Sequence, residues 1–202
     1  MATAGKRVRS AAGATDNLRA ILKSQYHAAL AMLRAAITRC PEHLWTAGDG
    51  HANPYWRLAY HTLYYTHLYL QPDLQAFHPW THHRRGIQRT ARNPGSGPRR
   101  PSPRRPPGAE PPYTKADVLA YWRICDGLVD NAVDTLDLGN PHSGFSWYPL
   151  SKLEHQIINL RHIQHHAAQL TDRLRAATGA GINWESSRKT PRRRGNRRVA
   201  AE

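Results

Sequence analysis

The sequence predicts an all-α protein, a four-helix bundle with a long disordered insert between its second and third helices. Four amphipathic segments have helical periodicity, capping signals or stops mark their ends, and no segment alternates like a strand. The 202 residues suffice for one domain with a sizeable core. We expect this domain to span residues 15–178, between a flexible N-terminus, 1–14, and a basic C-terminal tail, 179–202.

The first helix is expected to begin at a cap on Thr15 or Asp16 and to run to about Arg39, before Pro41 stops it. Its apolar residues recur at helical spacing: Leu18, Leu22, Ala29, Leu33 and Ala36.

The second helix is expected from Asn53-Pro54, a capping residue followed by proline at the first helical position, to about Leu70. Its two apolar rows predict that it is largely buried, and His61 interrupts one of them. A single histidine in such a row fits a hydrogen-bonded core residue better than a ligand, because a neutral imidazole needs only one partner. A histidine pair on another helix would reverse that preference.

Residues 84–112 consist mainly of Arg, Pro, Gly and Ser, with Ile87 as the one large aliphatic residue. Such a segment cannot bury enough apolar surface to offset the entropy lost on ordering it. We therefore expect it to be a disordered insert.

The third helix is expected to begin at a capping box, Thr114 to Asp117, and to end at Gly139. The face opposite its apolar row is acidic, and we expect it to be solvated rather than catalytic; it carries Asp126, Asp130, Asp134 and Asp137.

The fourth helix begins at a second capping box on Ser151 and ends at Gly179. His162 and His166 stand four residues apart, on the same side of this helix, and could hold one metal ion with a third ligand from elsewhere. Taken alone, the pair fits an amphipathic core helix with a histidine-rich edge equally well. The zinc-protease motif H-E-x-x-H is absent, because Ile163 follows His162.

The net charge of +15 invites a nucleic-acid function, but the basic residues cluster outside the helices. They lie in residues 1–9, 84–112 and 186–202, and the rest of the chain is close to neutral. No zinc-finger or RRM signature is present. We expect these segments to bind polyanions weakly, without sequence preference, and to lose them as salt rises.

Two distant cysteines, Cys40 and Cys125, fit buried reduced thiols better than a disulfide framework. No apolar run is long enough to cross a membrane, so we expect a soluble cytoplasmic protein that does not bind membranes. A homodimer is compatible with the sequence.

The order of the histidine motifs resembles the DinB/YfiT-like family of four-helix metalloproteins. The motifs are W-R-L-A-Y-H with His61 on the second helix and H-x-x-x-H-A-A-Q, from His162 to Gln169, on the last. The resemblance covers roughly residues 15–178. It implies that His61, His162 and His166 bind one divalent transition metal, zinc or nickel.

The resemblance also implies a metal open to substrate, as in family members that are metal-dependent transferases or isomerases of small thiols. We therefore expect a metal-dependent thiol S-transferase or hydrolase that acts on a small molecule; the catalytic residues are unknown. A non-catalytic protein whose metal joins two helices, its activity lost through the insert, is the alternative. His165, three residues after His162, is the nearest competing ligand, whereas the remaining candidates fit less well: His67, His78, His82 and His83.

Overall fold

The computed structural model describes residues 3–48, 50–90 and 111–188, with side chains from residue 13 onward. The predicted all-α class is confirmed, since the described residues form five helices and no strand. The helices are α1 (Thr3–Arg39), α2 (Glu42–Thr46), α3 (Tyr55–Tyr69), α4 (Lys115–Thr135) and α5 (Lys152–Thr178). None of them has the length and apolar character needed to cross a membrane.

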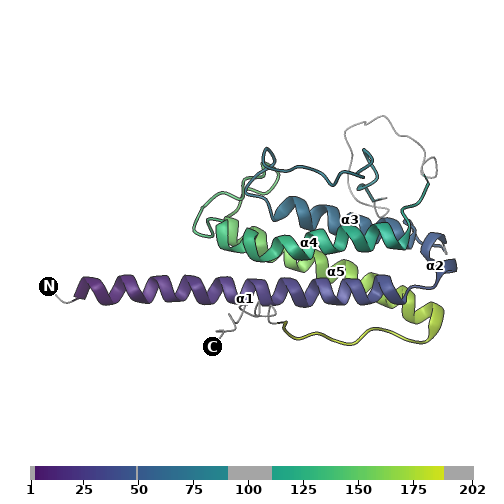
Figure 1. Cartoon of the computed structure of the whole chain (residues 1–202), viewed down its shortest axis with the longest axis horizontal. Helices are drawn as coiled ribbons and strands as arrows, with labels where there is room; N and C mark the ends of the chain where they lie inside the picture. Colours follow the sequence, from purple (N-terminus) through teal and green to yellow (C-terminus); the bar gives the residue numbers. More distant parts are fainter. Residues whose placement is uncertain (1–2, 49, 91–110, 189–202) are drawn as a thin grey trace, which may run out of the picture.

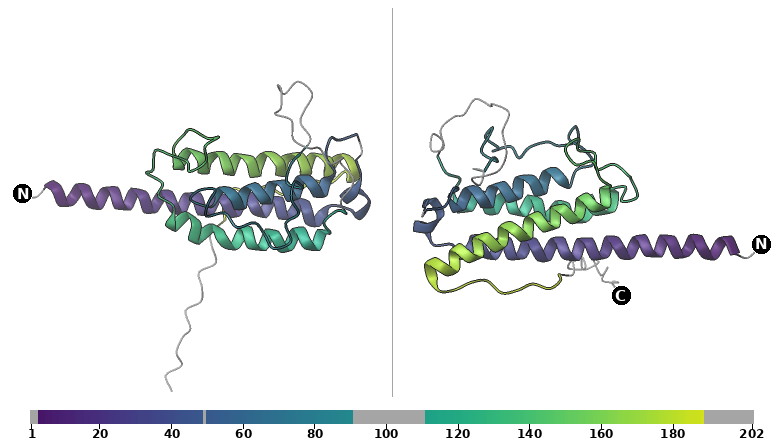
Figure 2. Two further views of the ribbon diagram at one scale, coloured as in Figure 1. Left: turned by 90° about the horizontal axis from the view of Figure 1, so that it is seen from above. Right: turned by 180° about the vertical axis from the view of Figure 1, so that it is seen from behind.

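The four long helices pack side by side around one core (Figure 1). Helix α1 packs against α4 and α5, and α3 packs against the same two helices. Seen from above, α4 and α5 lie on either side of α1 and α3 (Figure 2). Helices α1 and α5 run in one direction and α3 and α4 in the other, and residues 70–90 return along the molecule from the end of α3.

Aromatic residues fill much of this core, and their polar atoms join different helices. The Tyr26 hydroxyl donates to Gln156 Oε1 at 2.8 Å, and Trp122 Nε1 donates to the Leu30 carbonyl at 2.8 Å. Buried tyrosine and tryptophan need such partners, because an unpaired O–H or N–H in the core would cost free energy. These bonds fix how the helices pack against one another.

Two helix ends differ from the prediction. Helix α1 begins at Thr3, so Thr15 and Asp16 lie inside it and part of the segment expected to be flexible is helical. The preceding residues lack proline and are rich in alanine and arginine, which favour helix. Helix α4 ends at Thr135 rather than at Gly139, because Leu136 turns to an extended conformation with its side chain buried.

The capping box predicted at Thr114 has both of its contacts, and Ser151 caps α5 through one contact. The Thr114 hydroxyl accepts from the Asp117 N–H at 3.1 Å, and Asp117 Oδ2 accepts from the Thr114 N–H at 2.9 Å. The Ser151 hydroxyl accepts from the Glu154 N–H, and Gly179 ends α5 with a left-handed φ of 74°. The short helix α2 was not predicted; it buries Leu44 and Trp45. Cys40 and Cys125 are free and buried, as expected.

The segment predicted to be disordered is described only at its ends, and residues 91–110 lie outside the described part. Residues 84–90 pack against α3, which corrects the prediction for them: Ile87 is buried, and the Arg84 guanidinium lies 3.9 Å from the centre of the Tyr113 ring. The composition of the segment could not show this, because Ile87 finds its apolar partners on the helices.

The described part of the basic tail, residues 179–188, runs back beside α1. Arg39 donates to the Gly181 carbonyl at 2.6 Å, and Gln25 donates to the Ser186 carbonyl at 3.1 Å. The rest of the tail, residues 189–202, lies outside the described residues.

Candidate metal centre

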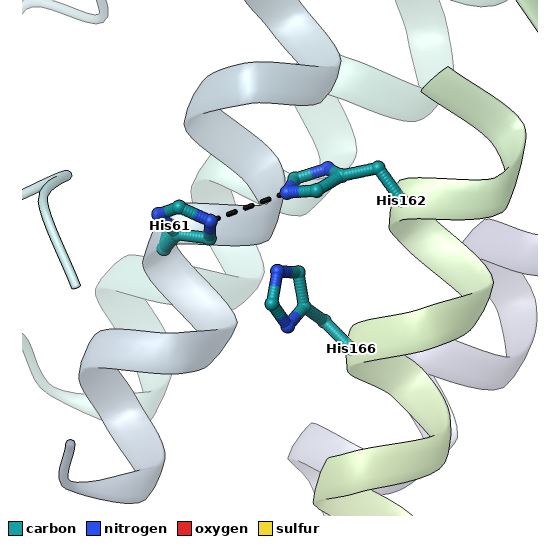
Figure 3. A group of neighbouring side chains, drawn as sticks. All are labelled: His61, His162 and His166. Atoms are coloured by element: carbon teal, nitrogen blue, oxygen red, sulfur yellow. Dashed lines mark hydrogen bonds between the residues drawn. The ribbon is translucent and has the colours of Figure 1, made fainter. Parts of the chain in front are cut away.

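The three histidines selected from the sequence come together where α3 faces α5. His61 lies on α3, and His162 and His166 lie one turn apart on α5 (Figure 3). The imidazole of His166 points into the gap beside the other two rings. Because His162 and His166 lie one turn apart on the face of α5 that packs against α3, both rings reach the same residue of α3. The fold therefore creates a cluster from residues that are about 100 positions apart.

The three rings are close enough to share one ion. The Nε2 atoms of His61 and His162 are 3.2 Å apart, and one nitrogen from each of the three residues lies within 4.8 Å of the others. With bonds of about 2.0–2.1 Å to a tetrahedral zinc ion, neighbouring ligand nitrogens would stand about 3.3 Å apart. The His61–His162 pair already has this spacing, and His166, whose nitrogen lies within 4.8 Å of both, would move closer to complete the set.

The outer nitrogens of two histidines are bound to carbonyl oxygens. His61 Nδ1 lies 2.6 Å from the Gln88 backbone oxygen, and His166 Nδ1 lies 2.7 Å from Gln169 Oε1. An oxygen acceptor requires the proton on Nδ1, so Nε2 keeps its lone pair for a metal. Such contacts orient metal-binding histidines and increase their basicity.

The third histidine has no such support. His162 Nδ1 is buried, and no hydrogen-bond partner for it exists among the described residues. Its Nε2 faces His61 Nε2. These two atoms share a hydrogen bond, and a cation between them would replace it with two metal–nitrogen contacts. The donor set therefore fits a divalent transition metal.

The electrostatic surroundings keep the rings neutral. Burial, with smaller contributions from the nearby His166 and His61, lowers the pKa of His162 to about 2. Burial also lowers the pKa of His166 to about 4 and lowers the pKa of His61. Neutral imidazole is the form that binds metal, so the site is ready for an ion at neutral pH without losing protons first.

The other histidines considered from the sequence have different surroundings. His165, the nearest competing ligand in the sequence, is exposed beside His166 and does not belong to the cluster. His67 Nδ1 is buried 3.1 Å from the Tyr121 hydroxyl, and His83 Nδ1 lies 2.6 Å from the Tyr60 hydroxyl. His78 and His82 are exposed. None of these five joins the described cluster.

Several neighbours of the triad were not selected from the sequence. Arg57 and Tyr65 lie one turn before and one turn after His61, and the Tyr65 ring centre is 4.8 Å from that of His61. Their spacing of four residues from His61 could have indicated them. No sequence signal indicates Gln88, because it contributes a backbone carbonyl from a segment rich in arginine.

Comparisons with known proteins found no matching family model, no matching curated protein and no matching solved structure.

Proposed function

We propose that this chain is a DinB-like four-helix-bundle protein that binds one divalent transition metal through Nε2 of His61, His162 and His166. One observation carries the proposal: three neutral imidazoles offer nitrogens within 4.8 Å of one another, and two have their outer nitrogens bound to carbonyl oxygens. Zinc and nickel both suit imidazole ligands. The resemblance in the order of the motifs supports the family.

Three protein ligands are typical of catalytic rather than structural metal sites, because a fourth position stays available to a small molecule. Together with the family resemblance, this favours a metal-dependent thiol S-transferase or hydrolase. When bound, the metal would supply charge that lowers the pKa of a thiol, so that the nucleophilic thiolate exists at neutral pH.

The residues of the chain then have distinct roles. The three histidines hold the ion, while the Gln88 carbonyl and Gln169 Oε1 fix the rings of His61 and His166. Tyr65 packs against His61, and its ring centre is 5.9 Å from that of His162, so it shields one side of the triad from water. Lower polarity strengthens the electrostatic interactions inside a site.

Metal content tests the proposed centre directly. Purified protein dialysed against zinc or nickel should retain close to one equivalent by elemental analysis. A variant in which His61, His162 and His166 are all alanine should retain none. The matched control is His165→Ala, which removes an exposed histidine from the same helix and should leave the metal content unchanged. Metal retained by the triple variant would contradict the assignment.

Turnover separates the enzyme from a protein whose metal only joins two helices. Metal-loaded protein should accelerate transfer between a small thiol and an electrophile, or hydrolysis of an activated ester, and chelated protein should not. Circular dichroism of the same samples measures the helix content. If chelation removes much of the helix and no metal-loaded sample turns over, the metal has a structural role.

A further inference from the structure

One arginine lies beside the triad and contacts the same short segment as His61. Arg57 Nε donates to the Arg89 carbonyl at 3.0 Å, and His61 Nδ1 lies 2.6 Å from the preceding carbonyl, that of Gln88. Arg57 precedes His61 by four residues, so both point to the same side of α3. Two consecutive carbonyls of one segment therefore fix two neighbouring side chains of α3, with the Arg89 carbonyl bound to Arg57 and the Gln88 carbonyl bound to His61.

The Arg57 guanidinium keeps most of its hydrogen-bonding capacity. A guanidinium has five N–H donors, and the contact with Arg89 uses one of them. Within the described ranges, the two terminal nitrogens of Arg57 have no hydrogen-bond acceptor and no carboxylate partner. Arg57 is also half-buried, and burial lowers its pKa. A partly desolvated cation without a counter-charge favours the binding of an anion.

The surroundings of the triad are asymmetric. On one side of His61 lies the positive charge of Arg57, which contributes to lowering the pKa of that histidine. On the other side lies the aromatic ring of Tyr65. The triad between them is neutral. A small molecule at the metal would thus meet positive charge on one side and an apolar surface on the other.

We propose that Arg57 binds the carboxylate of the small molecule that occupies the open side of the metal centre. This inference rests on the proposed function and specifies its substrate class: a small thiol that carries a carboxylate. Carboxylate matches the planar donors of a guanidinium, which bind its two oxygens together. Arg57 is a specificity residue in this arrangement and does not bind the metal.

Two small thiols that differ in one group test the proposal. Cobalt(II) replaces the native ion and reports thiol binding through its absorption spectrum. Mercaptoacetate carries a carboxylate, and mercaptoacetamide has the same length without the charge. Wild-type protein should bind mercaptoacetate about tenfold more tightly, as expected for a partly exposed charge-assisted contact. Arg57→Gln should remove this preference and leave the affinity for mercaptoacetamide unchanged. Arg57→Lys, which keeps the charge but not the fork of donors, should retain part of it.

Arg161→Gln is the matched control, because Arg161 is an exposed neighbour of His162 and should not affect the preference. A preference of the same size in wild type and Arg57→Gln would overturn the inference, since chelation of cobalt by mercaptoacetate would then explain it. Equal affinities for the two thiols in wild type would overturn it as well. Failure of wild-type protein to bind cobalt is a different result, because it would overturn the proposed metal centre itself.

Discussion

Two clusters of polar side chains that include histidine lie at different helix interfaces and differ in charge. At the α3–α5 interface, the described part of the chain brings no carboxylate to His61, His162 and His166; their close contacts are one another, Tyr65 and carbonyl oxygens. At the α1–α4 interface, His27 lies between two carboxylates: Nδ1 is 2.8 Å from Asp126, and Nε2 is 3.2 Å from Asp130. Burial dominates in the first cluster and lowers pKa values. The Asp126 contact dominates in the second and raises the pKa of His27.

The comparison shows that the neighbours of a histidine decide its role. A protonated imidazole between two carboxylates makes an ion pair and has no lone pair for a metal. A neutral imidazole anchored at Nδ1 is a ligand. The acidic face of α4, which we expected to be merely solvated, thus has a structural use, and Lys23 extends it by contacting Asp134 at 2.5 Å.

Removing one histidine from each cluster should give the largest difference, which is measured in zinc affinity. His162→Ala should weaken zinc binding by more than about 100-fold, because changes to contacts behind metal ligands already cost 10–100-fold. His27→Ala should leave the zinc affinity unchanged. Competition with a chelator of known affinity measures both. Equal losses in the two variants would show that the effect is general destabilisation rather than the loss of a ligand.

Removing the hydrogen bond that holds the His166 ring should have the next largest effect on zinc affinity. Gln169→Ala removes the acceptor at 2.7 Å from His166 Nδ1 and frees the ring to rotate. We expect a loss of zinc affinity of about tenfold, at the lower end for such contacts because Gln169 is exposed. Gln164→Ala changes a half-buried glutamine on the same helix and serves as the control. An unchanged affinity in Gln169→Ala would mean that the ring is held by packing alone.

The smallest effect is expected at the α1–α4 interface, and it depends on pH. Asp126→Asn should lower the free energy of unfolding by about 1 kcal/mol near pH 6, as for a partly exposed ion pair. The raised pKa of His27 means that this stabilisation is fully present below the unfolded-state value of about 6.5 and is lost as pH rises through the folded-state value. The difference between Asp126→Asn and wild type should therefore shrink towards pH 9.

Urea denaturation at several pH values measures this difference. Asp172→Asn, an exposed carboxylate on α5, should show no such pH dependence. Metal affinity should be the same in all three proteins. A constant difference between pH 6 and about pH 9 would mean that His27 is neutral in the folded protein and that its pKa is not raised by the carboxylates.

Periodicity and capping signals in the sequence were enough to predict the four long helices. These helices lie where apolar residues recur, and Thr114, Ser151 and Gly179 cap them at the expected positions. These features are local, so a few neighbouring residues determine them. Helix ends without a strong signal were predicted less well, as the start of α1 shows.

The sequence by itself selected His61, His162 and His166, because helical spacing places the pair on one face and the motif order resembles a known family. It did not indicate which groups hold those rings. The Gln88 carbonyl, the position of Arg57 and the carboxylates around His27 follow from contacts between segments far apart in the chain. Only the tertiary structure decided these neighbours, and with them the charge of each histidine, because protonation depends on the burial and the partners that packing provides.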